Sequence, residues 1–321
     1  RGILRYYELT GEKSLLELVQ KLYNLYKSEA MTENYANANW FGRPEWTEPC
    51  AIIDSFILAV GLWKHTGNPA CLEDAHHIYF NAMGYAQRPN GGWGCDVCLG
   101  ASDKFIRPIS GSFEAWWCCS MRGGEGLGRA VEYLYFADNE SIILPFFSDS
   151  SAHIDFEDGQ INIKQSTSYP YEGRVKLEIE KSSVMNSKQL KLFTPGWVID
   201  PVIKINGKDI PFNVDNGFIV INAVLKDGDC IEYSFAQSIR IEQMINKNNI
   251  NGYHTFRHGP LVLGISNLRE AVISPEIDKL AYTGSGSYQI KNTALTLSPI
   301  NDMYLKSEDD ALNDIRQVLF K

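Results

Sequence analysis

Apolar positions in the first part of the chain recur at helical spacing. In residues 12–30, five such side chains fall on one side of a helix: Leu15, Leu16, Val19, Leu22 and Tyr23. The same spacing predicts further helices in residues 50–68, 70–86 and 124–138. The stretch before Gly11 is typical of the end of another helix, because glycine commonly follows a last helical turn. The first 138 residues are therefore predicted to be a helical domain.

Two long connections interrupt this helical pattern. Residues 28–48 and 85–117 are rich in Trp, Gly, Asn and Pro, which are typical of loops rather than helices. Long loops carried by a rigid scaffold often hold binding and catalytic residues. We therefore expect the functional residues in or beside these two segments.

The periodicity changes near residue 139 from helical spacing to alternation. Residues 174–182, RVKLEIEKS, alternate strictly, and residues 217–225, GFIVINAVL, alternate more loosely. Asn206-Gly207 lies between two such runs and predicts a tight hairpin. Short strands recur to about residue 265, as in an antiparallel β-sandwich. We expect a β-sandwich domain over 139–300 and a helical tail over 301–321.

Composition and charge exclude several classes of partner. The formal net charge is −9 and Lys and Arg are not clustered, so nucleic acid and anionic membrane surfaces are poor partners. The sequence has no apolar run of membrane-spanning length. Aromatic residues make up 12% of the chain, and aromatic rings commonly stack on sugars. A carbohydrate is therefore the partner that composition favours.

The cysteines are grouped in a way that favours metal binding or redox chemistry. Six of the seven lie between residues 50 and 119, and their odd number does not fit a secreted disulfide scaffold. This usage indicates a reducing compartment, so we expect a cytoplasmic location. Cys71, in an apolar helix, and Cys230, in a strand, are best explained as buried apolar residues.

Two predicted helix starts carry cysteines. In TEPC, Cys50 follows Glu48 and a first-turn proline, and Cys118 and Cys119 come shortly before the helix of 124–138. The positive end of a helix favours the thiolate form of cysteine, which is both nucleophile and metal ligand. Together with the Glu48 carboxylate, the three thiolates would give four ligands of the kind that Zn²⁺ binds tetrahedrally.

A second ligand set is equally compatible with the spacing. Cys95 and Cys98 form a C-x-x-C pair, and with Cys118 and Cys119 they would make a closed Cys₄ zinc site of structural type. A redox role for C-x-x-C is less favoured because no βαβ pattern surrounds it. This second set would suit a non-catalytic carbohydrate-binding or scaffold protein.

Taken together, the E-x-C segment and the later C-C pair resemble glycoside hydrolase family 127, the cysteine glycosidases that act as β-L-arabinofuranosidases. In this sequence Glu48 and Cys50 match the first motif, and Cys118 and Cys119 match the second. YYELTGE near the start and FRHGPLVLG near the end are weaker similarities. The resemblance implies a fold with part of an (α/α)6 toroid followed by an antiparallel β-sandwich, an α + β arrangement.

The resemblance also implies roles for individual residues. Cys118 would be the nucleophile, Zn²⁺ would be held by Glu48, Cys50, Cys118 and Cys119, and an upstream glutamate would be the general acid/base. Glu29, in KSEAM, is our first choice for that glutamate and Glu33 is the second. The substrate would be a β-L-arabinofuranoside or a related sugar.

The chain also departs from the family pattern. Ser120-Met121-Arg122-Gly123-Gly124 follows the cysteine pair where better-known members have Pro-Pro-Asn. Fewer helices are found than a complete toroid needs, so we expect the helical domain to be incomplete at its N-terminus. Another sugar reaction on a similar toroid, such as epimerisation, is a further alternative. Candidate substrate contacts near the cysteines are Trp40, Trp46, Trp93, Trp117 and Arg122.

Overall fold

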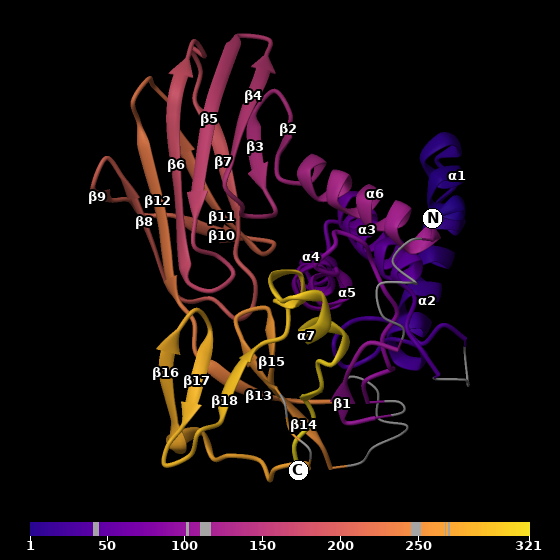
Figure 1. Ribbon diagram of the computed structural model, residues 1–321. Coiled ribbons are helices and arrows are strands. Elements are labelled where there is room, and N and C mark those ends of the chain that lie inside the picture. Colours follow the sequence, from indigo (N-terminus) through magenta and orange to yellow (C-terminus); the bar gives the residue numbers. More distant parts are fainter. Residues whose placement is uncertain (41–44, 101–102, 110–116, 245–251, 267, 269) are drawn as a thin grey trace. The chain divides into compact units, whose positions relative to one another are not determined.

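The described residues form two compact units (Figure 1). The computed structural model describes the chain except residues 41–44, 101–102, 110–116, 245–251, 267 and 269. The first unit comprises residues 1–66, 70–127 and 239–321, and the second comprises residues 67–69 and 128–238.

The first unit contains most of the helical residues. Its helices begin with α1 (Gly2–Thr10), α2 (Lys13–Glu29), α3 (Pro49–Thr66) and α4 (Pro69–His77). A π-helical turn (Ile78–Met83) and α5 (Gly84–Ala86) continue α4, and α6 (Cys118–Glu132) and the short α7 (Glu308–Leu312) come later. Gly11 ends α1 in the left-handed conformation, as predicted. Among the described residues, no helix is long and apolar enough to cross a membrane.

An antiparallel sheet completes the first unit. It contains β1 (Phe105–Ile106), β13 (Ile239–Gln243), β14 (His254–His258), β15 (Leu261–Ser266), β16 (Leu280–Gly284), β17 (Ser287–Ile290), β18 (Thr296–Pro299) and β19 (Arg316–Gln317). The fully buried Asn81, in the π-helical turn, accepts from the Val262 N–H and donates to the Pro260 carbonyl. These bonds pair buried polar groups and attach the helices to the sheet.

The second unit contains two sheets. One has the order β10 (Asn213–Asp215), β11 (Phe218–Ala223), β7 (Lys188–Phe193), β3 (Ser141–Leu144), β2 (Phe136–Ala137), with β3 and β7 parallel. The other has the order β4 (Ser150–Phe156), β5 (Gly159–Thr167), β6 (Gly173–Ser182), β12 (Cys230–Ala236), β8 (Ile199–Ile205), β9 (Lys208–Asp209). A hydrogen bond between Thr194 Oγ1 and the buried Tyr233 hydroxyl, 3.2 Å long, joins the two sheets.

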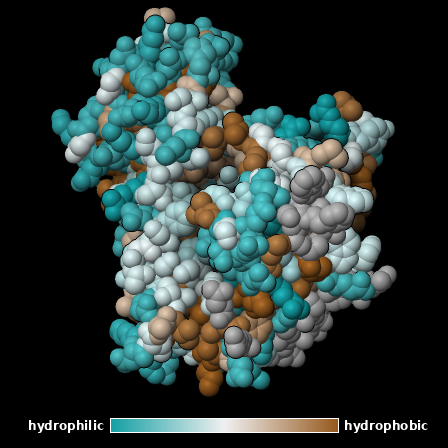
Figure 2. Space-filling view, in the orientation of Figure 1, coloured by the Kyte–Doolittle hydropathy of each residue, from teal (hydrophilic) through white to brown (hydrophobic). Residues whose placement is uncertain are grey.

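Alternating side chains explain how the second unit obtains its core. On β6, Val175, Leu177 and Ile179 are buried, and the residues between them face solvent. Burying a side chain of this kind contributes about 1.5–3 kcal/mol. Figure 2 shows polar side chains over much of the surface of these strands. The predicted hairpin is confirmed, since Asn206 and Gly207 have positive φ between paired β8 and β9.

The compact units differ from the domains expected from periodicity. The helix-to-strand change near residue 139 is present, but residues 239–321 group with the helical residues rather than with the strands before them. The predicted helical tail is mainly irregular, with one short helix, α7, and the strand β19. The reason is that β19 pairs with β1 and that Asn81 bonds to Val262 and Pro260, which ties the last residues to the first 127.

A buried lysine in the second unit gives a test of its packing. The side chain of Lys188 is 4% exposed, and its ammonium group donates to Asp158 at 2.7 Å and to the Asn139 carbonyl at 2.8 Å. The bond from Lys188 lowers the pKa of Asp158 from its usual 3.8 to about 2. The pair therefore stabilises the unit fully above the usual pKa and loses this effect as the pH falls toward 2.

We predict that Asp158→Asn lowers the thermal midpoint by about 5 °C at pH 7, because Lys188 would lose its carboxylate. The difference in thermal midpoint between this variant and the unchanged protein, measured by circular dichroism, should become smaller between pH 5 and pH 2. Asp155→Asn, at an exposed carboxylate on the same sheet, is the matched control and should change the midpoint little. A gap that stays constant with pH would contradict this account.

Candidate functional site

Two helix starts in the first unit carry the predicted metal ligands. The Glu48 carbonyl accepts from the N–H groups of Ala51 and Ile52, so Glu48 directly precedes the first turn of α3 and Cys50 lies within it. Helix α6 begins at Cys118, six residues earlier than the sequence predicted. Cys118 and Cys119 are therefore the first residues of the helix rather than part of a preceding loop. Both helix starts direct unpaired N–H groups toward this region.

The structure brings together the predicted set Glu48, Cys50, Cys118 and Cys119. One ligand atom from each lies within 4.8 Å of all the others. The sulfurs of Cys50 and Cys118 are 3.6 Å apart, and Cys118 Sγ is 4.0 Å from Glu48 Oε1. Residues 70 positions apart in sequence thus form one cluster.

The cluster fits a tetrahedral metal ion in both donor chemistry and spacing. Three sulfurs and one carboxylate oxygen are ligands that Zn²⁺ accepts. Two sulfurs bound about 2.3 Å from a tetrahedral ion lie about 3.8 Å from each other, close to the spacing between Cys50 and Cys118. Only a small movement would be needed for these four residues to hold zinc.

The three thiols of the cluster differ in exposure and acidity. Cys118 is exposed, whereas Cys119 is 3% exposed. Hydrogen bonding from Cys95, and then from Cys118 and Cys50, lowers the pKa of Cys119 to about 7. Burial raises the pKa of Cys50, and its hydrogen bond to Cys118 raises it further. Cys118 is thus the accessible sulfur, and Cys119 is the buried thiol that ionises most readily near neutral pH.

The alternative Cys₄ set is not brought together. Cys95 contacts Cys119, but the Cys98 thiol faces the Asn37 carbonyl at 3.9 Å, and burial raises the pKa of Cys98 to about 12. Among the described residues, the metal-binding group that forms uses Glu48 and Cys50 in place of Cys95 and Cys98. Cys95 is therefore a neighbour of the cluster, a role that the C-x-x-C spacing did not indicate.

Glycines on α6 allow that helix to approach its neighbours closely. A Cβ atom on Gly123 would lie 2.1 Å from the Trp93 indole nitrogen, and one on Gly126 would lie 2.3 Å from Ile53 Cδ1 of α3. The Trp93 backbone N–H also donates to Ser120 Oγ at 3.2 Å. The residues that depart from the family pattern therefore pack α6 against Trp93 and α3. The i, i+3 spacing of the two glycines was the available signal for this contact.

The E-x-C segment is held by a buried ion pair. Thr47, which is fully buried, donates its N–H to the Asp96 carbonyl and accepts the Asp96 N–H on Oγ1. The Asp96 carboxylate pairs with Arg88 at 2.8 Å, both side chains being 2% exposed. Burial raises the pKa of Asp96 to about 6, and Arg88 opposes that shift. Glu48 thus directly follows Thr47, whose backbone N–H and side-chain Oγ1 are both bonded to Asp96.

The predicted substrate contacts divide into two groups. Trp40 and Trp117 are 45% and 63% exposed, and the rings of Trp40 and Trp46 meet edge to face at 5.6 Å. These three tryptophans remain available to a sugar. The prediction for Trp93 was wrong, because its indole is buried against Gly123. Arg122 is held by Asp54 and Glu125, so its guanidinium is engaged within the protein.

The two candidate acid/base residues have opposite environments. Glu29 is the exposed last residue of α2. Glu33 is fully buried, its N–H donates to the Leu99 carbonyl, and its Cγ lies beside Gly100. Arg257, also fully buried, donates to the Glu33 carbonyl at 3.2 Å. The structure thus fixes Glu33 and leaves Glu29 open to solvent.

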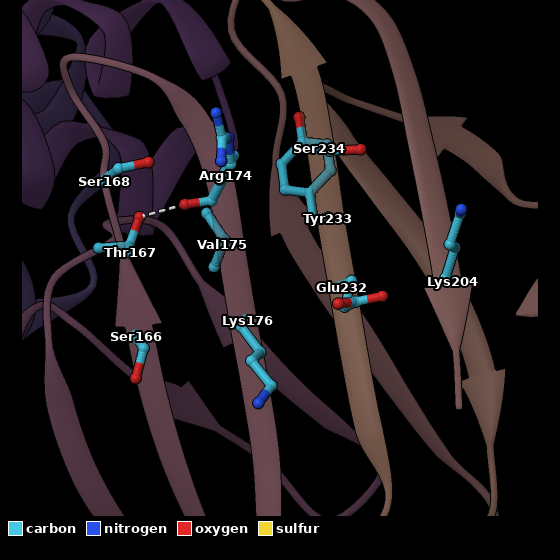
Figure 3. Close-up of a pocket in the computed structure, with 10 residues that line it drawn as sticks. All are labelled: Ser166, Thr167, Ser168, Arg174, Val175, Lys176, Lys204, Glu232, Tyr233 and Ser234. Atoms are coloured by element: carbon cyan, nitrogen blue, oxygen red, sulfur yellow. Dashed lines mark hydrogen bonds between the residues drawn. The ribbon is translucent and has the colours of Figure 1, made fainter. Parts of the chain in front are cut away.

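A separate hollow lies on the six-stranded sheet of the second unit (Figure 3). It encloses about 390 Å³ and is lined by strand residues that include Arg174, Lys176 and Lys204. Each of these cations has a carboxylate partner, at Glu172, Glu178 and Asp209 respectively. The three lining cations are therefore already paired within the second unit.

Comparison with known families bears on the second unit directly. Residues 141–237 match a family described as "Beta-L-arabinofuranosidase, GH127 middle domain". These residues are similar to the GH127 middle domain. The match covers the strands β3 to β12 and does not extend to the cysteine cluster. No curated protein sequence matches the chain.

Solved structures share the fold of this chain. A glycoside hydrolase has a TM-score of 0.80 at 16% identity, over 99% of this chain and 64% of its own. A GH127 beta-arabinofuranosidase has a TM-score of 0.76 at 17% sequence identity, over 99% of this chain and 58% of its own. A GH127 beta-L-arabinofuranosidase from Geobacillus stearothermophilus T6 has a TM-score of 0.73 at 15% sequence identity, over 99% of this chain and 58% of its own. The chain therefore spans about three fifths of each structure, and the shared fold is α + β with antiparallel sheets.

We predict that Gly123→Ala destabilises the protein by about 1–3 kcal/mol and weakens metal binding, because the methyl group would displace the Trp93 indole or α6. Gly124→Ala is the matched control, since no atom lies within 4 Å of a Cβ at that position. It should be neutral or stabilise by about 0.5–1 kcal/mol. Urea unfolding measures the stability of both variants. Equal changes in the free energy of unfolding would contradict the packing described for Gly123.

Proposed function

We propose that the protein is a retaining glycoside hydrolase that cleaves β-L-arabinofuranosides or a related sugar, with Cys118 as nucleophile and zinc as cofactor. The observation that carries the proposal is the convergence of Glu48, Cys50, Cys118 and Cys119 within 4.8 Å. The match of residues 141–237 to the GH127 middle domain supports the reaction class. We also propose that the helices correspond to part of an (α/α)6 toroid and the strands of the second unit to a β-sandwich.

The exposure of the thiols supports a division of roles. Cys118 Sγ, the exposed sulfur, would attack the anomeric carbon while the bond to the leaving oxygen breaks. Glu48, Cys50 and Cys119 would hold zinc with it. When bound, the ion would keep these thiols deprotonated and stabilise sulfur as a leaving group. Cys119, whose sulfur lies in the cluster, would serve to bind metal.

A carboxyl group must protonate the leaving oxygen and later deprotonate the attacking water. Cys118 would attack from the face opposite the leaving oxygen, and the water would then displace the sulfur from the face that this oxygen left, so two inversions keep the anomeric configuration. A general acid has to retain its proton near neutral pH, which burial favours. We therefore propose Glu33 for this role, in place of our first choice Glu29, because Glu33 is buried and fixed.

Stacking surfaces for the sugar would come from the exposed tryptophans. Trp117 precedes the nucleophile directly, and Trp46 lies two residues before Glu48. Both tryptophans precede the proposed metal ligands closely enough in sequence to be held near the same helix starts. We propose these rings, with Trp40, as substrate contacts.

We predict that Cys118→Ser reduces release of 4-nitrophenol from 4-nitrophenyl β-L-arabinofuranoside by about a thousandfold or more, because the thiolate nucleophile is lost. Cys230→Ser, on a strand of the second unit, is the matched control and should retain activity. Circular dichroism would verify that both variants fold. Undiminished turnover by Cys118→Ser, or an isomerised sugar in place of a hydrolysed one, would overturn the proposal.

The acid/base assignment has a separate test that uses leaving groups. Glu33→Gln should reduce cleavage of an alkyl arabinofuranoside by about 10²–10⁴-fold, because a poor leaving group needs a proton donor. The first step with a dinitrophenyl glycoside should change much less. Glu29→Gln should resemble the unchanged protein on both substrates. If Glu29→Gln shows the selective loss and Glu33→Gln does not, the roles are reversed.

A further inference from the structure

Four charged side chains form a closed ring between α1, α3 and α6. Arg122 of α6 contacts both Asp54 of α3 and Glu125 of α6. Arg1 contacts the same two acids, with Nη1 2.7 Å from Asp54 Oδ1 and Nη2 2.9 Å from Glu125 Oε1. The four side chains are 26–49% exposed. Ion pairs this exposed add little to global stability, so their value lies in geometry.

The ring lies one helical turn from the cysteine cluster on both helices. Asp54 is four residues after Cys50 on α3, and Arg122 is four residues after Cys118 on α6. Residues four apart share one face of a helix. The two helices therefore face each other through two successive contacts, first Cys50 with Cys118 at 3.6 Å and then Asp54 with Arg122.

We propose that Asp54 and Arg122 are positioning residues for the metal site. Their contact fixes the rotation and height of α6 against α3, which places Cys118 opposite Cys50 before any ion is bound. The inference rests on the proposed function for the use of the site. The four cluster side chains come from the starts of two different helices, so a metal-free cluster needs an outside restraint to stay assembled. The glycines allow α6 to approach, and the ion pair determines where along α3 it stops.

The chain offers a matched control on the same helix. Arg129 pairs with Glu132 at 2.5 Å, and both residues belong to α6. Removing this pair takes away an arginine charge from α6 without breaking a link to α3. A variant at Arg129 therefore separates the effect of charge from the effect of the bridge.

The test is the zinc dissociation constant, measured by competition with a chromophoric chelator. Arg122→Gln should weaken zinc binding about tenfold, and Asp54→Asn should weaken it more, because Asp54 accepts from both Arg122 and Arg1. Adding Arg122→Gln to Asp54→Asn should cause little further loss, since the two residues act as one unit. Arg122→Lys should be intermediate, and Arg129→Gln should change binding less than twofold.

A second measurement uses the metal-free protein and does not depend on the proposed function. Treatment with diamide should link Cys50 to Cys118 at a rate that falls at least fivefold in Asp54→Asn, followed by peptide mass spectrometry. If the unchanged protein binds no zinc but shows this rate difference, the function fails and the positioning role stands. Equal linking rates, fully additive losses in the double variant, or an equal loss in Arg129→Gln would overturn the positioning role.

Discussion

The whole cluster depends on how closely α6 can approach Trp93 and α3. Gly123 and Gly126 lie on that side of the helix, and a side chain at either position would occupy space already filled by an indole or an isoleucine. Without this contact, Cys118 and Cys119 could not reach the start of α3. The buried pair of Arg88 and Asp96 fixes the opposite side through Thr47. Thus the ligands are presented by rigid elements, which is the arrangement that precise metal geometry requires.

The four residues of the cluster could be predicted from the sequence because their signal is local. Two short motifs each supply two of them, and each motif lies at a helix start whose polarity favours thiolate. Only one long-range step was left, the pairing of the motifs, and the family resemblance provided it. The hairpin at Asn206-Gly207 was predictable for a similar reason, since the two residues determine their own turn.

Other features depend on contacts that no local pattern encodes. Trp93 is of a residue type that often stacks on sugars, but its indole is buried against Gly123, which lies 30 residues away in sequence. Cys95 and Cys98 look equivalent in sequence, yet only Cys95 reaches Cys119. The grouping of residues 239–321 with the helices arises from the pairing of β19 with β1 and from the bonds of Asn81 to Val262 and Pro260. Glu29 and Glu33 differ mainly in burial, which is a property of the folded chain.

The adjacent cysteines have a consequence for how this site can change over time. Neighbouring residues on a helix point about 100° apart, so one sulfur faces outward and the other inward although the two residues are chemically identical. Inserting a single residue before Cys118 would turn Cys118 to the direction that Cys119 now has. Deleting one would turn Cys119 to the direction of Cys118 and Ser120 to that of Cys119. The pair therefore tolerates no shift in register, and a repeated amino acid here encodes two different environments.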